Sequence, residues 1–173
     1  MKQFLLLLVC LLSITANSQN TIGKTLQNIS IKDVNNKSCS IPYWGEKILV
    51  IFYTDPDAKD VNEPLSTALK NRKYPLEKYQ GVGISNSKDS WIPNSIIYYV
   101  AKEKQKKYPN SIILIDDNHT ISNAWTLNNT DNSGYVIIIG KDKRVKFIRM
   151  IKNQDESKLI IKEVLRIIDE EIK

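Results

Sequence analysis

The junction at residues 48–60 constrains the fold of this chain more than any other stretch. Residues 48–52 are apolar and mostly β-branched, which predicts a strand buried on both faces of a sheet. A polar turn follows, and apolar residues then recur at helical spacing, which predicts a helix over about residues 60–71. A buried strand that leads directly into a helix indicates a βα unit, and such units build parallel sheets.

The rest of the chain continues this alternation of strand and helix patterns, with hairpin patterns near both ends. The predicted class is therefore α/β, with a central mixed sheet, flanking helices and an N-terminal β-hairpin. The predicted elements are hairpin strands at 29–31 and 39–41, strands at 48–53, 79–85 and 112–115, helices at 60–71, 93–107 and 120–125, a second hairpin at 135–139 and 144–148, and a last helix from about residue 155.

Apolar stripes predict which side of each later helix is buried. In the helix at 93–107 we expect Ile96, Ile97, Val100 and Ala101 to face the core. The last helix repeats apolar residues at helical spacing from residue 161 to residue 172, which predicts a continuous inward stripe.

Residues 1–18 have the pattern of a cleaved secretory signal. A basic start is followed by a short apolar core and by small residues at alternate positions before Gln19. The alternative is a lipoprotein signal acylated at Cys10, but the preceding Val9 is bulky for that pattern. We therefore expect export to the periplasm, one domain over residues 19–173, and no membrane span in the mature chain.

The chain is basic, with a formal net charge of +6, and its lysines include a cluster at Lys102, Lys104, Lys106 and Lys107. That cluster has two interpretations, the solvated face of a helix or a patch for an anionic partner. Nucleic acid is not expected as a partner of an exported protein.

Cysteine usage restricts the redox chemistry of the mature chain. Cys39 is the one cysteine left after removal of residues 1–18, so no intramolecular disulfide can form. Cys39 alternates with Ile41 in a predicted strand, which favours a small buried hydrophobe over a reactive thiol.

Several motifs of the second half of the chain, taken together, resemble one known family. The motifs are Trp91-Ile92-Pro93-Asn94-Ser95, Lys106-Lys107-Tyr108-Pro109, Ile113-Leu114-Ile115-Asp116, Asn123-Ala124-Trp125-Thr126-Leu127, Val136 to Ile139, and Lys141-Asp142-Lys143-Arg144-Val145. Their order and spacing are similar to those of the YtfJ family, small periplasmic proteins of Gram-negative bacteria with a thioredoxin-like fold.

The resemblance implies a thioredoxin-like scaffold without the CxxC motif and without an assigned activity or cofactor. Asp57 and Asp60 stand at the two places where such a fold carries its cysteines. A carboxylate cannot exchange disulfides, because a thiolate is the attacking group in that reaction. Residues 131–135, the region that matches the cis-proline of thioredoxins, contain no proline. The resemblance therefore implies loss of dithiol chemistry.

The carboxylates Asp55, Asp57 and Asp60 allow three roles. Acidic side chains at a helix start commonly cap its free N–H groups, and residues 57–60 are similar to a capping box. The alternatives are a site for Ca²⁺ or Mg²⁺, or a carboxylate pair for acid–base catalysis. The acidic turn at 116–118 likewise favours a cap over a metal site, and His119 is expected to be a loop residue.

Two classes of function follow from these expectations. The first is a binding module for a protein or peptide of the bacterial envelope, at a candidate surface of Asp55, Gly134 and Tyr135 beside the former redox site. The alternative is a divalent-cation-binding protein or carboxylate-based enzyme that uses Asp55, Asp57 and Asp60. Neither class requires a cofactor.

Overall fold

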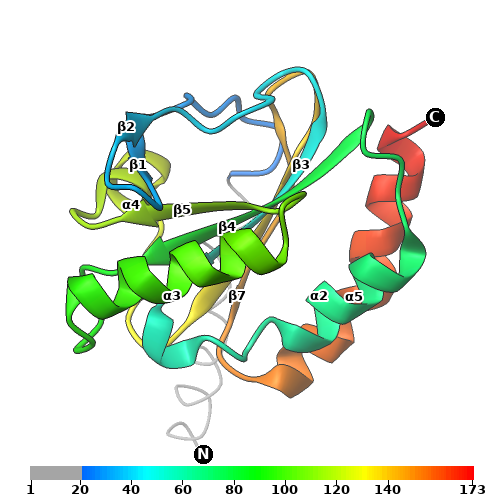
Figure 1. Cartoon of the computed structure of the whole chain (residues 1–173). Helices are drawn as coiled ribbons and strands as arrows, with labels where there is room; N and C mark the ends of the chain where they lie inside the picture. The colour runs from blue at the N-terminus through cyan, green and yellow to red at the C-terminus, as the bar shows by residue number, and fades with distance from the viewer. Residues whose placement is uncertain (1–20) are drawn as a thin grey trace, which may run out of the picture.

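The computed structural model describes residues 21–173, so the predicted signal segment at 1–18 lies outside the described residues. A seven-stranded mixed sheet forms the centre of the domain, in the strand order β2-β1-β5-β4-β3-β6-β7 (Figure 1). The elements are β1 (Ile31–Asp33), β2 (Ser38–Cys39), β3 (Ile48–Thr54), a 3-10 turn η1 (Pro56–Ala58), α2 (Glu63–Arg72), β4 (Tyr79–Asn86), α3 (Asn94–Lys107), β5 (Ile112–Asp116), α4 (Thr120–Trp125), β6 (Gly134–Ile139), β7 (Val145–Ile151) and α5 (Gln154–Glu171).

The predicted α/β class, the mixed sheet and the N-terminal hairpin are confirmed. Strands β3, β4 and β5 run parallel to one another, whereas β6 and β7 are antiparallel and extend the sheet on the other side of β3. The hairpin of β1 and β2 joins the sheet through β5. Each predicted helix is present within the described residues.

Successive side chains of a strand point to opposite sides of the sheet. Both sides of the central strand β3 are buried, because each side packs against other elements. Ile48 and Val50 of β3 pack with α2 and α5, while Leu49 and Ile51 pack with α4 and the N-terminal segment. Figure 1 shows α2 and α5 lying together on one side of the sheet, with α3 crossing the same side.

Two helices differ in detail from the sequence-based expectation. Ile97 and Ala101 of α3 are buried as predicted, but Ile96 and Val100 are 51% and 45% exposed, so the prediction that they face the core is wrong. The reason is that α3 packs around Ile115 of β5 through Ile97, Tyr98 and Ala101, and Ile96 and Val100 lie on the other side of the helix.

The other difference is the start of α2. This helix begins at Glu63 rather than near residue 60, because the 3-10 turn η1 occupies the segment before it. Pro64 lies in the first turn of α2, where the missing N–H costs no helical hydrogen bond. Among residues 21–173, no helix combines the length and the apolar character that a membrane crossing requires.

Candidate functional site

The predicted site residues gather at one edge of the sheet. The parallel strands β3, β4 and β5 end at Thr54, Asn86 and Asp116, and β6, which runs the opposite way, begins at Gly134. The segments that follow or precede these residues therefore meet at the same edge. In open α/β sheets this carboxyl edge is where ligands bind.

Asp55 is the most deeply buried carboxylate of this edge, with 0% of its surface exposed. Its Oδ1 accepts a hydrogen bond of 3.0 Å from the Asp57 amide, and its Oδ2 accepts one of 2.7 Å from the Asn132 amide. The Asp55 amide in turn donates to the Ser133 carbonyl at 3.0 Å. Burial raises the pKa of Asp55, although the two backbone N–H donors oppose that shift. Asp55 thus ties the turn after β3 to the loop before β6.

Asp57 and Asp60 point to different surroundings. Asp57 accepts hydrogen bonds from the Ser90 hydroxyl at 3.1 Å and from the Trp91 amide at 3.2 Å, so it holds the loop between β4 and α3. Asp60 is exposed and lies before the start of α2, whose N-cap residue is Asn62. The predicted capping box over residues 57–60 is therefore wrong. It is Asp55 that caps a helical turn, and this turn is η1.

The three carboxylates do not converge on a common point. Asp55 turns into the protein, Asp57 turns toward the loop of Ser90, and Asp60 faces solvent. Within the described part of the chain, no group of three or more His, Cys, Asp or Glu side chains is placed to hold a metal ion.

Gly134 and Tyr135 are also buried, and their backbone is already paired on both sides. Strand β6 lies between β3 and β7, with Gly134 opposite Thr54 on one side and Ile151 on the other. The Tyr135 hydroxyl donates to the Asn128 carbonyl at 2.7 Å. The predicted surface of Asp55, Gly134 and Tyr135 is therefore buried, and the exposed groups of this edge belong to the residues around these three.

Space around Gly134 is so limited that glycine is the residue that fits. A Cβ at this position would lie 2.7 Å from Nδ2 of Asn62 and 3.2 Å from both Thr54 Oγ1 and Val61 Cγ2. The Asn62 side chain is held there by a hydrogen bond of 2.9 Å to Thr54 Oγ1. Gly134 thus lets the start of α2 approach the sheet closely.

Trp91 is the most exposed large side chain at this edge. Its exposed fraction is 82%, while its backbone is held by Asp57. Lys59, Asp60, Asp131 and Asn132 are exposed on the neighbouring turns. The edge therefore presents one exposed aromatic side chain, whose backbone is held by Asp57, and several charged and polar groups.

Sequence reasoning missed a second polar cluster at the same edge. Nε2 of His119 lies 2.5 Å from Oδ1 of Asp89, and the other carboxylate oxygen of Asp89 accepts from Nδ2 of Asn86 at 2.5 Å and from the Thr130 hydroxyl at 2.6 Å. Burial alone would raise the pKa of Asp89, but hydrogen bonds from Thr130, Asn86 and His119 together lower it. His119 has a left-handed φ of 55° and lies in a loop, as expected. Polar residues just after the ends of β4 and β5 were the signal that could have predicted this pairing.

Asp116 has the capping role that its sequence position predicts. Its side chain is buried and accepts hydrogen bonds of 2.8 Å from the amides of both Thr120 and Ile121, at the start of α4. The Tyr53 hydroxyl donates to the same carboxylate at 3.1 Å. Both carboxylate oxygens of Asp116 therefore accept hydrogen bonds from groups of the protein itself.

Cys39 lies on β2, apart from Asp55, Asp57 and Asp60 at the carboxyl edge. It is half-buried and packs against the core cluster that includes Ile31 and Ile41. Burial raises the pKa of its thiol, which lowers the fraction of reactive thiolate. Cys39 therefore packs against the core as predicted, but it is half-buried rather than fully buried.

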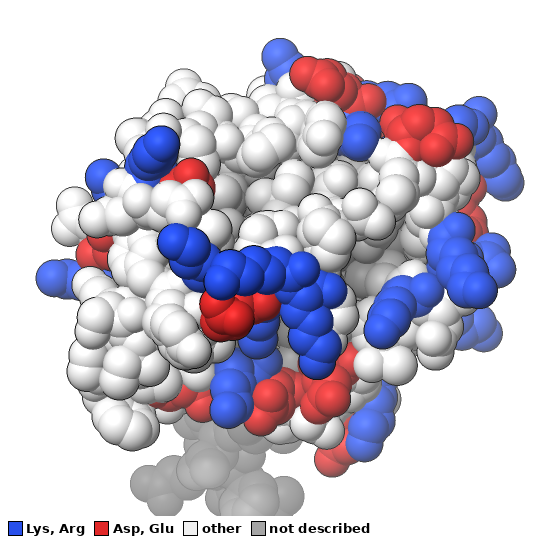
Figure 2. All heavy atoms as spheres, in the orientation of Figure 1, with Lys and Arg blue, Asp and Glu red and all other residues white. Residues whose placement is uncertain are grey.

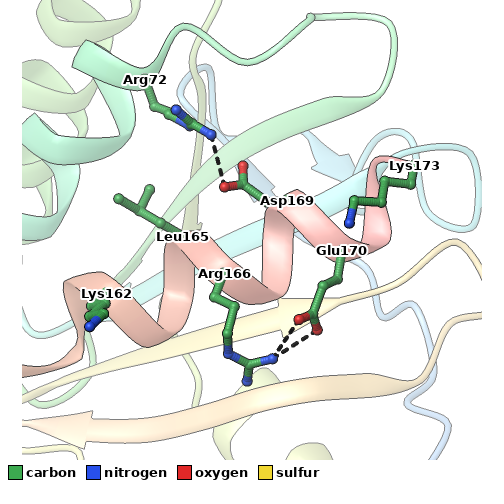
Figure 3. A pocket seen from close by; sticks show the side chains of 7 residues that line it. All are labelled: Arg72, Lys162, Leu165, Arg166, Asp169, Glu170 and Lys173. Atoms are coloured by element: carbon green, nitrogen blue, oxygen red, sulfur yellow. Dashed lines mark hydrogen bonds and ion pairs between the residues drawn. The ribbon is translucent and has the colours of Figure 1, made fainter.

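Two shallow hollows lie away from the carboxyl edge. One, of about 400 Å³, lies between the hairpin and α3. The other, of about 420 Å³, lies along α5 beside the end of α2, and Figure 3 shows two ion pairs among its charged groups. Arg72 pairs with Asp169 at 2.8 Å and Arg166 with Glu170 at 2.7 Å, so these groups are engaged within the protein. This second hollow is lined by Arg72, Lys162, Leu165, Arg166, Asp169, Glu170 and Lys173.

Comparison with known sequences identifies relatives that have no assigned activity. A family model described as "Bacterial protein of unknown function (YtfJ_HI0045)" matches residues 29–171. An uncharacterized protein of Haemophilus influenzae is 25% identical over 171 residues, which cover 90% of this chain and 92% of that protein. The uncharacterized protein YtfJ of Escherichia coli is 33% identical over 94 residues, which cover 53% of this chain and 50% of that protein.

Comparison with solved structures identifies the fold. The thioredoxin domain of a thiol-disulfide oxidoreductase from Bacteroides vulgatus superposes with a TM-score of 0.55 at 12% identity, covering 83% of this chain and 96% of that one. A peroxiredoxin-like protein from Aquifex aeolicus gives a TM-score of 0.58 at 11% identity, covering 84% and 86%. At these identities the likeness shows the fold alone, and the predicted thioredoxin-like architecture is confirmed.

Proposed function

This chain belongs to the YtfJ_HI0045 family of bacterial proteins of unknown function, and from that premise we propose that it is a thioredoxin-fold binding protein without dithiol redox activity. The observation that carries the proposal is the structural role of Asp57, a residue that the family resemblance matches to a cysteine of thioredoxins. Its carboxylate accepts hydrogen bonds from the Ser90 hydroxyl and the Trp91 amide, so it fixes a loop where a dithiol would react.

The chemistry of the edge supports a binding role over catalysis. Disulfide exchange needs a thiolate, and the single described cysteine, Cys39, is on β2 with a raised pKa. Asp55, Asp57 and Asp60 point in different directions, which also disfavours a cation site or a carboxylate pair built from them.

The partner we propose is a peptide segment of another protein of the bacterial envelope. The predicted signal at residues 1–18 supports a periplasmic location. A peptide cannot add to β6, because that strand is paired with β3 and β7. Trp91 is instead the anchor, because an exposed tryptophan on a fixed backbone gives a large contact area at low entropic cost.

Two measurements test this proposal. Insulin reduction should show no activity above the uncatalysed reaction. Peptides selected from a random library on the purified protein and labelled with a fluorophore should bind it in an anisotropy titration, and Trp91→Ala should weaken their binding by about tenfold or more, as expected of an aromatic anchor.

The matched control is Leu159→Ala, which removes an equally exposed apolar side chain (80%) from α5 and should leave peptide binding unchanged. Disulfide reduction by the purified protein would overturn the proposed loss of redox activity. Selected peptides that bind Trp91→Ala as tightly as the unaltered protein would overturn the assignment of the anchor.

A further inference from the structure

The outward side of α3 carries exposed apolar side chains followed by lysines. Ile97 and Ala101 face the core, so residues on the opposite side of the helix face solvent. There Ile96, Tyr99 and Val100 are 51%, 67% and 45% exposed. These three residues are three or four positions apart, so they share one side of the helix. The same spacing places Glu103, Lys106 and Lys107 on that side.

The later part of α3 is also basic, with Lys106 and Lys107 on this side and Lys102 and Lys104 at its two opposite edges. The helix contains four lysines and one glutamate, and Glu103 is paired with Lys106 at 2.7 Å. Among the described residues, Lys102, Lys104 and Lys107 form no ion pair. Figure 2 shows lysines gathered over the later part of α3 and a surface without charged side chains over its beginning.

We propose that the outward side of α3 binds the surface of an anionic phospholipid bilayer. A helix of 14 residues is about 21 Å long and can lie flat on such a surface. Tyr99 would enter the headgroup region, where aromatic side chains with a polar tip are favoured. The lysines would pair with lipid phosphates while their methylene stems remain in contact with apolar groups.

A bilayer fits this surface better than an acidic protein does. Ile96 and Val100 lie outside the hollow that Tyr99 borders, and a protein partner would need a matching pocket for each of them. Fluid headgroups accommodate protruding side chains without such pockets. Charge complementarity supports either occupant, so the decisive observation is the combination of protruding apolar groups with unpaired lysines on one helix.

The test is sedimentation of the purified protein with vesicles of phosphatidylglycerol or of phosphatidylcholine. We expect binding to phosphatidylglycerol vesicles, with at least about tenfold weaker binding to phosphatidylcholine. Binding should also weaken in 1 M NaCl, where the screening length falls to about 3 Å.

Two triple variants separate the apolar and the charged contributions. We expect at least about tenfold weaker binding from replacing Ile96, Tyr99 and Val100 by alanine, and the same from replacing Lys102, Lys104 and Lys107 by glutamine. Alanine and glutamine are good helix formers, and circular dichroism checks that both variants remain folded.

Leu159→Ala on α5 is the matched control and should bind vesicles like the unaltered protein. Trp91 remains unchanged in all variants, so failure of this inference is distinguishable from failure of the peptide site. Absence of binding to phosphatidylglycerol vesicles would overturn the inference, as would full binding by either triple variant. Capture of an acidic protein without vesicle binding would overturn it in favour of a protein partner.

Discussion

The backbone amide of Asn132 donates a hydrogen bond of 2.7 Å to the buried carboxylate of Asp55. This contact joins the turn after β3 to the loop before β6, at the edge where thioredoxin-like proteins carry their reactive groups. In this chain a carboxylate therefore serves as a structural link between the two segments, with Asp57 making a similar link to the loop before α3.

Replacing Asp55 by asparagine should destabilise the protein by about 1–3 kcal/mol. The amide can still accept from the Asp57 N–H through its oxygen, but its NH₂ group would then face the Asn132 N–H, and two donors cannot pair. Urea unfolding measures the change. Asp60→Asn at an exposed position is the control, and it should remain within about 0.5 kcal/mol of the unaltered protein. Equal stability of the two variants would contradict a structural role for Asp55.

Gly134→Ala should destabilise the protein by about 1–3 kcal/mol, because its Cβ would overlap the Asn62 amide and neither Asn62 nor the sheet can move freely. Gly83→Ala is a matched control in β4. Its Cβ would meet a single atom, the Ile112 carbonyl oxygen at 3.9 Å, so we expect stability equal to or slightly above that of the unaltered protein. Thermal unfolding of both variants tests this prediction, which fails if they melt together.

Protonation of the Asp89 carboxylate should lower the stability of the protein in acid. Its pKa in the folded protein is below the ordinary value of 3.8, because hydrogen bonds from Thr130, Asn86 and His119 outweigh the effect of burial. A lowered folded pKa contributes stability that is present above the unfolded pKa and is lost as the pH falls through the folded pKa.

The measurement is urea unfolding at pH 5 and at pH 3. The loss of stability between these two pH values should be smaller in Asp89→Asn than in the unaltered protein. A loss of the same size in both proteins would show that Asp89 does not carry this pH dependence.

Divalent cations should leave the melting temperature unchanged. A cation that binds the folded state raises the melting temperature, and Asp55, Asp57 and Asp60 do not point to a common site. Thermal shift with Ca²⁺, Mg²⁺ and Mn²⁺ at millimolar concentration tests this expectation. A rise that disappears in Asp57→Asn would instead support the cation-binding alternative.

The order of strands and helices could be predicted from the sequence, because apolar periodicity and turn residues act over short stretches of chain. The apolar run at 48–52 can be recognised within a single strand, and the apolar stripe of α5 within a few helical turns. The absence of cysteine at residues 57 and 60 was likewise visible in the sequence.

The tertiary structure decided which side chains are partners at the carboxyl edge. Asp55 and Asn132 are 77 residues apart, and His119 and Asp89 are 30 apart, so neither pairing leaves a local pattern. The outward position of Ile96 and Val100 also depends on how much of α3 the sheet covers, which helical spacing alone does not specify. Short-range patterns determine elements, whereas hydrogen-bond partners and exposed faces depend on how distant elements pack.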